Sequence, residues 1–334
     1  MPDDTAPSNL PLSFAKPTGM VEIREPDGEG RLTLADRQLL NHLLAVAVRD
    51  LKAETHTVQL AEIRRFAADA RGTGVETDNR RLKQSLQRLQ KTTVVYNYLS
   101  SEKGKVWGSS VLIPDVEVQE ATGRVEYSFS KNVREHLAEP ALFSVISLKI
   151  QYQFDSKYGL ALYEILRRYA DRRANAPWWE VSVPELRALL GCERKLTEWK
   201  DFRKRALDPA LEEINRLSGF VVSLEEVRQG RGGKVVGVRF RIEQKDAVAA
   251  AEAMRELDKP RVQRRGERRA QARDAATVRA IGWLQDQDVS TRLRWSRRAE
   301  DIGLVLPKAA TAPENLVAWV PSIATVLIEE EGLR

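Results

Sequence analysis

The sequence contains very few of the residues from which metal sites and covalent active centres are built. Its 334 residues include one cysteine, Cys192, and three histidines, His42, His56 and His136, which are far apart in the chain. A single cysteine excludes an internal disulfide and a cysteine-rich zinc site. Scattered histidines argue against metal centres and catalytic triads that need clustered imidazoles. We therefore expect no metal, no cofactor and no catalytic residue.

Long apolar runs are also missing. The longest strictly apolar run is Leu43–Val48, whereas a membrane-spanning helix needs about 20 residues. The first residues, Met1–Thr5, are polar and acidic, unlike a signal peptide. These features predict a cytoplasmic protein without a membrane partner.

The composition is typical of a globular protein with a heavily charged surface. Hydrophobic residues make up 42% of the chain and charged residues 31%, which is above the usual quarter or so. At about 100–200 residues per domain, the length predicts two or three domains. Lys and Arg together number 54 against 48 Asp and Glu, a net charge of +6. This excess is modest, so only a clustering of the basic residues would indicate a polyanionic partner.

The first half of the chain has the pattern of a winged helix. Residues 1–30 are rich in proline and glycine, which predicts a disordered N-terminal arm. Apolar periodicity predicts a helix that opens at Thr33 with Asp36 in a capping box, followed by helices over 59–70 and 78–91. A β-hairpin over 92–113 and a further strand at 125–129 follow. Three helices and a hairpin within 31–145 are the plan of a helix-turn-helix variant.

The same plan recurs over residues 146–244. A helix opens near 154–158, Ser182 caps a second helix, and a longer helix over 197–217 is expected to kink or restart at Pro209. Strands at 220–227 and 235–242 flank a glycine-rich turn. Residues 245–334 read as a basic linker and a helical extension. The predicted fold class is therefore α+β, with two tandem winged-helix domains and a C-terminal helical extension.

The helix predicted over 78–91 carries the chemistry needed to read DNA. Leu82, Leu86 and Leu89 lie within about 60° of one another on a helical wheel. Arginine can pair with guanine edges, Asn and Gln with adenine, and Lys with phosphates. The alternative is an ordinary solvated face, but such faces usually alternate in sign. The opposite side does not alternate, and it supplies the candidate DNA contacts Asn79, Arg80, Arg81, Lys83, Gln84, Gln87 and Arg88.

The second helix-turn-helix pattern repeats this signal. Basic residues near a helix N-terminus oppose the helix dipole, so their cluster at the front of 197–217 favours DNA contact. The alternative is a solvated cluster balanced by Glu198 and Asp201. Basic hairpin tips suit phosphate contact, although they could also be solubilised turns. The further candidates are Lys157, Lys195, Lys200, Arg203, Lys204 and Arg205, with Lys103, Lys105, Arg228, Arg231 and Lys234 at the tips.

Other readings of these segments are disfavoured. The turn Gly230–Lys234 lacks the spacing of a phosphate-binding loop and sits between two strands, so we expect no nucleotide there. Tyrosines 158, 163 and 169 could act as nucleophiles in a nicking enzyme. Enzymes of the rolling-circle type need a His-x-His pair, and the sequence has none. We therefore expect no enzymatic activity.

Two segments resemble a known family. Leu148–Glu164 resembles the signature of iteron-binding plasmid replication initiators, and Trp199–Asn215 resembles their second recognition helix. The resemblance covers about residues 30–243. It implies tandem winged helices that dock in successive major grooves of double-stranded DNA at repeated origin sequences, and initiation of theta-mode plasmid replication in bacteria.

The resemblance also implies partners. It implies a monomer that initiates, in equilibrium with a homodimer that represses its own promoter, and contact with host replication proteins such as the helicase and the host initiator. Residues 245–334 lie outside the pattern. The alternative function is a winged-helix transcriptional regulator without a role in replication.

Overall fold

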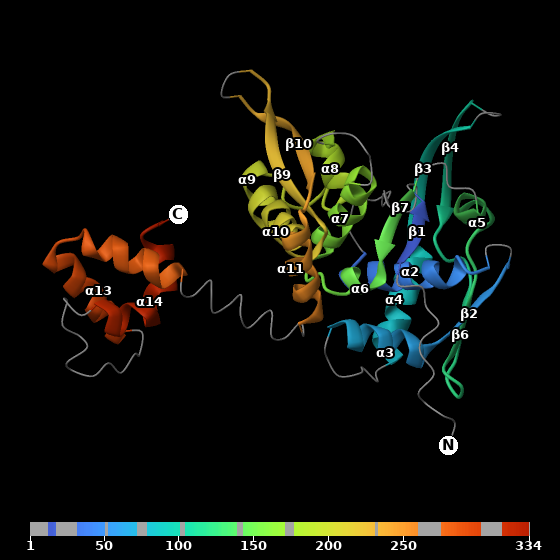
Figure 1. Ribbon diagram of the computed structural model, residues 1–334, viewed down its shortest axis with the longest axis horizontal. Coiled ribbons are helices and arrows are strands. Elements are labelled where there is room, and N and C mark those ends of the chain that lie inside the picture. Colours follow the sequence, from blue (N-terminus) through green and yellow to red (C-terminus); the bar gives the residue numbers. More distant parts are fainter. Residues whose placement is uncertain are drawn as a thin grey trace. The chain divides into compact units, whose positions relative to one another are not determined.

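The chain folds into two compact units, Met1–Pro260 and Arg261–Arg334. The computed structural model describes residues 13–17, 32–50, 53–71, 79–100, 104–138, 143–170, 177–230, 233–259, 275–301 and 316–333. Each unit has a buried apolar core of its own. The first unit contains both winged helices (Figure 1).

The first winged helix follows the predicted order of elements. Its helices are α2 (Leu34–Ala47), α3 (Leu60–Arg71) and α4 (Asn79–Lys91), and its hairpin pairs β3 (Thr93–Ser100) with β4 (Gly104–Val111). The predicted capping box is confirmed. The backbone N–H of Asp36 donates to Oγ1 of Thr33 at 3.3 Å, and that of Thr33 donates to Oδ2 of Asp36 at 2.8 Å.

A small sheet completes this domain. It has the strand order β2-β6-β5, with β2 (His56–Gln59), β5 (Val116–Gln119) and β6 (Arg124–Tyr127). The predicted strand at 125–129 overlaps β6, whereas β2 and β5 were not predicted. The Tyr127 hydroxyl donates to the Leu43 carbonyl of α2 at 2.6 Å, which holds the sheet against the first helix. Helix α5 (Lys131–Ala138) follows.

The prediction of a disordered arm over 1–30 is wrong for one segment. Residues Ser13–Pro17 form strand β1, which pairs antiparallel with β7 (Phe143–Ser147). Both Phe14 and Lys16 are buried in this strand. The partner strand, β7, comes after the whole first winged helix in the sequence. No local sequence pattern around β1 therefore predicts the pairing. The rest of 1–30 lies outside the described residues.

The second winged helix begins after the short helix α6 (Leu148–Gln151). Its helices are α7 (Lys157–Ala170), α8 (Val183–Leu189), α9 (Trp199–Phe202) and α10 (Asp208–Leu217). Its sheet has the order β8-β10-β9, with β8 (Trp178–Ser182), β9 (Phe220–Arg228) and β10 (Val235–Gln244). The hairpin β9–β10 is the predicted wing.

The predicted irregularity near Pro209 takes the form of a wide helical turn. The segment η1 (Arg203–Leu207) is π-helical and joins α9 to α10, and Pro209 lies in the first turn of α10. Proline has no backbone N–H to bond the carbonyl four residues earlier. Just before the proline, the N–H of Asp208 bonds to the carbonyl of Arg203, five residues back, as in a π-helix.

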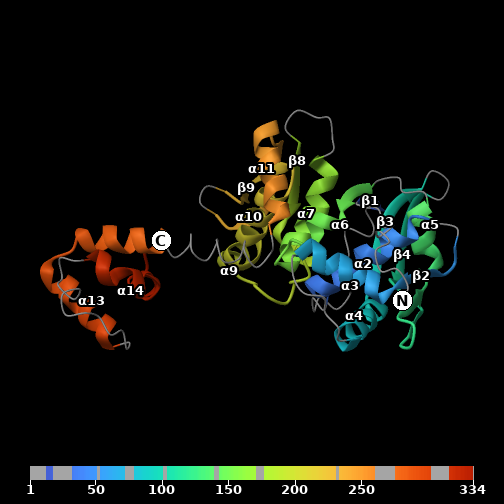
Figure 2. The same ribbon diagram turned by 60° about the horizontal axis from the view of Figure 1, so that its bottom comes forward.

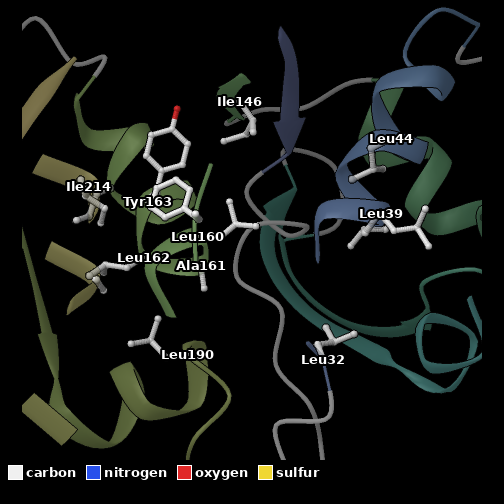
Figure 3. Close-up of a cluster of buried hydrophobic side chains, with 14 of the residues drawn as sticks. Leu32, Leu39, Leu44, Ile146, Leu160, Ala161, Leu162, Tyr163, Leu190 and Ile214 are labelled. Atoms are coloured by element: carbon white, nitrogen blue, oxygen red, sulfur yellow. The ribbon is translucent and has the colours of Figure 1, made fainter. Parts of the chain in front are cut away.

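Helix α7, the first helix of the second winged helix, lies at the junction between the two domains. In Figures 1 and 2 it stands between α10 on one side and α2 on the other. Leu160 and Leu162 of α7 are fully buried, and one cluster of buried residues extends from α2 to α10. Figure 3 shows Tyr163 and its neighbours in α7, with Ile214 of α10 on one side and Leu39 of α2 on the other. The two domains therefore share one apolar core.

The remaining residues are helical where they are described. Helix α11 (Ala247–Asp258) closes the first unit and packs on α10. The second unit contains a helix over 275–285, α13 (Val289–Asp301) and α14 (Leu316–Glu330), around a core with Trp295 and Trp319. No helix in the described part of the chain is both long and apolar enough to cross a membrane.

Candidate nucleic-acid interface

Helix α4 turns an apolar side to the core and a polar side to solvent. Leu86 and Leu89 are buried, and α4 packs against α2. The helix contains no acidic residue, so nothing on it would repel a phosphate. Arginine and glutamine side chains can pair with guanine and adenine edges. Four of the predicted DNA contacts on this polar side are exposed: Arg80, Arg81, Gln84 and Gln87.

Two other predicted contacts on α4 already have protein partners. Asn79 accepts a hydrogen bond from the guanidinium of Arg64 on α3. Lys83 pairs with Glu120, in the turn that follows β5. The Lys83 side chain is still 42% exposed, and exposed pairs of this kind are weak. A phosphate can therefore compete with Glu120 for this lysine.

Arg88 is the predicted contact that the fold itself uses. Its Nε and Nη2 donate to the two carboxylate oxygens of Asp36 at 2.8 Å and 2.9 Å. The Asp36 side chain is completely buried, whereas that of Arg88 is 34% exposed. The hydrogen bonds that Arg88 donates to Asp36 raise the pKa of Arg88 above its usual value. Arg88 thus fastens α4 to the N-terminus of α2, and a DNA contact by Arg88 stays a prediction.

The basic residues of the second winged helix gather on α9 and η1. Lys200, Lys204 and Arg205 are exposed, and so is Lys195 in the preceding loop. The opposite side of these turns is buried through Phe202 and its neighbours. Arg205 lies 3.7 Å from Asp201, one turn earlier, in an exposed ion pair.

One carboxylate of the wing holds the front of this helix. Glu226 of β9 accepts a hydrogen bond from Nε1 of Trp199 at 2.9 Å. It also pairs with Arg203 through Oε1 and with Arg228 through Oε2. Only 16% of the Glu226 side chain is exposed. Helix α9, the segment η1, the wing and two predicted DNA contacts therefore meet at one acid.

The pKa of Glu226 reflects this arrangement. Burial alone would raise the pKa, but hydrogen bonds from Trp199, Arg203 and Arg228 outweigh burial and lower it. Glu226 therefore stays ionised at neutral pH, and its carboxylate holds both guanidinium groups in place. Arg203 is 42% and Arg228 47% exposed, so each keeps donors that face solvent.

The remaining predicted contacts fall into three groups. On the second wing, Lys234 is exposed, Gly230 turns the chain with a φ of +73°, and Arg228 also donates to the Gly233 carbonyl at 3.2 Å. At the start of α7, the Lys157 ammonium lies 5.3 Å from the Tyr158 ring centre, so it is engaged within its own domain. Outside the described residues or side chains lie Lys103, Lys105 and Arg231.

A buried polar network fixes how the two winged helices meet. Lys16 of β1 donates to Glu164 of α7 at 2.8 Å and to Asn41 of α2 at 2.7 Å. Asn41 donates in turn to Glu164 and, at 2.6 Å, to Gln151 of α6. None of these four side chains is exposed to any extent. Because a buried charge without its partner is costly, the network favours one orientation of α2 against α7.

Comparison with protein families identifies both winged helices. Residues 23–167 match the model described as "Initiator Replication protein, WH1", and residues 182–242 match "Initiator Rep protein, WH2". Together the two matches cover more than half of the chain, in the expected order. The chain belongs to the initiator replication protein family.

A solved structure supports the fold of this initiator. The chain is similar to the Pi initiator protein, whose crystal structure is in complex with iteron DNA. The identity is 16%, the TM-score is 0.55, and the match covers 71% of this chain and 99% of that chain. The predicted tandem winged helices are thereby confirmed. No curated protein matches the chain.

Sequence reasoning missed the residues that support the initiator's basic side chains. Glu226 follows Phe220, Val222 and Leu224 at alternate positions of β9, which face inward. An acid in such an inward series needs a partner, and this pattern was the available signal. The pairing of Asp36 with Arg88 could not be predicted in this way, because the role of Asp36 in the capping box already explains an acid at that position.

Proposed function

We propose that this initiator binds repeated origin sequences of a plasmid as a sequence-specific reader of double-stranded DNA. Helix α4 reads one major groove, and the helix formed by α9, η1 and α10 reads the next. The wing residues Arg228 and Lys234 contact phosphates beside the groove. The similarity to an initiator that was crystallised with iteron DNA supports this proposal.

The observation that carries the proposal is a pair of exposed basic helices on one chain. Each follows two other helices and precedes a hairpin, the position of a recognition helix. The network of Lys16, Asn41, Gln151 and Glu164 supports a fixed spacing between them. With a fixed spacing, one copy of the chain would select repeats in which the centres of the two contact sites are about one helical turn apart.

The finer parts of the proposal concern assembly. A single copy binds each repeat and starts replication, whereas a homodimer binds and represses the promoter of its own gene. The DNA-bound initiator recruits host replication proteins, such as the helicase and the host initiator. We infer that the protein works as a scaffold in the bacterial cytoplasm, bound to the plasmid, and performs no covalent chemistry.

A binding experiment tests the central part of the proposal. The purified chain should bind direct repeats from the region of its own gene more tightly than random duplex, by a factor of about 10³ or more at physiological salt. Chelators and nucleotides should change neither affinity. Equal affinity for repeats and random DNA would contradict the proposal.

A genetic experiment separates replication from regulation alone. The gene and its adjacent repeats, placed on a marker without another origin, should support replication in a suitable host. Failure of the marker to replicate, together with specific binding in vitro, would favour a transcriptional regulator instead.

A further inference from the structure

The C-terminal unit is a folded domain that the family matches leave unassigned. It has its own core, in which Leu284, Trp295 and Trp319 are buried. The family matches end at residue 242. A folded unit of this kind on a DNA-binding chain needs a role of its own.

Two of its helices form a helix-turn-helix. The helix over 275–285 is separated from α13 by the turn 286–288, and the two run in clearly different directions in Figures 1 and 2. Asp288 closes the turn: its Oδ1 accepts from the Thr291 backbone N–H at 2.7 Å and from the Ser290 hydroxyl at 2.9 Å. DNA-binding helix-turn-helix units have a turn of similar length between their two helices.

Helix α13 presents a basic side to solvent. Ser290, Leu293, Arg294, Arg297 and Arg298 recur at helical spacing and line an open hollow of about 420 Å³. We call these five residues the α13 face. All five are exposed, while Trp295 and Ala299 on the other side are buried. The helix is therefore amphipathic, with arginine as the main polar residue of its outer side.

The fold does not explain all three arginines. Arg294 pairs with Glu331 at 2.6 Å, and Arg298 pairs with Glu330 at 2.7 Å, at the end of α14. These pairs are solvent-exposed, and such pairs stabilise a fold little. Arg297 forms no ion pair or hydrogen bond with any residue in the described part of the chain. Its exposed guanidinium is therefore open to an external anion.

We propose that the C-terminal unit is a third DNA-contacting module, whose α13 face binds the phosphate backbone of the duplex beside the sites of the two winged helices. The proposal rests on the proposed function, because it needs the winged helices to bring DNA to this unit. Glu330 and Glu331 orient two of the arginines, and Arg297 supplies an unpaired charge between them. Guanidinium groups are well suited to phosphate.

The charge of the sequence before the helix over 275–285 supports DNA, rather than an acidic protein, as the ligand of the α13 face. The first residues of the second unit, 261–274, contain six arginines and two acids. This chain segment adds positive charge next to the module, as expected along a polyanion. A module tethered to domains that already hold DNA also meets the flanking duplex at high effective concentration. Weak contacts between the α13 face and phosphates then suffice for binding.

The experiment compares two single-arginine variants of the full chain on two duplexes. The short duplex contains one repeat only, and the long duplex adds random flanks on both sides. Arg297→Ala should make the salt dependence of binding shallower by about one unit on the long duplex, and should leave the short duplex unchanged. The long footprint of the wild-type protein should lose its flanking protection in this variant.

Matched variants make the result specific. Arg279→Ala removes the same charge from the other helix of the turn, outside the α13 face, and should behave as wild type on both duplexes. Arg297→Lys keeps the charge and should keep the salt slope. Arg297 is exposed, so the variants should fold; circular dichroism and the emission of the buried tryptophans check this.

Two outcomes overturn the proposal. One is an Arg297→Ala protein with the wild-type salt slope and footprint on the long duplex. The other is an equal loss for Arg279→Ala, which would indicate unspecific charge. Failure of the proposed function has a different signature: the wild-type protein would bind repeat and random duplexes equally, while the comparison of Arg297→Ala with wild type could still be made on random DNA.

Discussion

Replacing Glu226 by glutamine should separate specific from non-specific DNA binding. The change keeps the shape of the side chain but removes the charge that Arg203 and Arg228 share. Charge-assisted hydrogen bonds contribute about 1.5–3 kcal/mol each. Both guanidinium groups are partly exposed and can turn to water, so we expect a loss of only about 1–2 kcal/mol in the free energy of unfolding. The protein should remain folded.

The effect on DNA should be opposite for the two kinds of site. Without Glu226 the Arg203 side chain is no longer held for a base edge, and specific binding should weaken by about 1–3 kcal/mol. Removal of a negative charge beside DNA should leave non-specific affinity unchanged or raise it. The ratio of specific to non-specific affinity, measured by fluorescence anisotropy at several salt concentrations, should therefore fall.

The neighbouring acid provides the control. Glu225 is exposed, points to the opposite side of β9 from Glu226 and pairs with Arg241 of β10. Glu225→Gln makes the same charge change and should shift specific binding by less than about 0.5 kcal/mol. A Glu226→Gln protein with the wild-type specificity ratio, or one that matches Glu225→Gln, would refute the idea that Glu226 positions Arg203.

Three other predictions concern the two domains. Arg81→Ala should weaken binding to repeats more than to random DNA, by about 1–3 kcal/mol, whereas Lys234→Ala should weaken both equally and make the salt slope shallower by about one unit; equal losses everywhere would contradict these separate roles. Arg88→Ala should lower the free energy of unfolding by about 2–4 kcal/mol, because buried Asp36 would lose its partner; a loss under about 0.5 kcal/mol in denaturant titrations would show that this pair does not fasten α4. Glu213 is a buried residue of α10 that accepts a hydrogen bond from the Asp155 backbone N–H at 2.9 Å, and burial raises its pKa from 4.5 to about 7. The folded protein therefore binds this proton more tightly than the unfolded chain, and the free energy of unfolding should fall as the pH rises through that interval; Glu213→Gln should flatten this dependence, and an unchanged pH profile would contradict it.

Most helices could be predicted because their signal is local. The leucines of α4 recur every three or four residues, and Ser182 with Glu185 marks the start of α8 as predicted. The wings were predicted from β-branched runs on either side of polar turns. Short strands such as β1 carry no such signal, because β1 is stabilised by pairing with β7 far along the chain.

The candidate interface was predicted only in part for a related reason. Exposed basic side chains can be recognised on a helical wheel, so Arg80 and Arg81 emerge from the sequence alone. Whether a basic residue is occupied depends on which acid the fold brings to it. The ion pairs Arg88–Asp36 and Arg203–Glu226 form only after helices and strands have packed. The spacing of these residues in the sequence does not show which acid each arginine will pair with.

The most direct test of the account is a hydroxyl-radical footprint of a single copy of the chain on a single repeat. If α4 and the helix of α9, η1 and α10 read successive major grooves, two protected regions should appear with centres about one helical turn, or 10 bp, apart. Arg81→Ala should weaken protection in one region and Arg203→Ala in the other. One protected region only, or equal weakening of both regions by each variant, would contradict the claim that one chain reads two grooves.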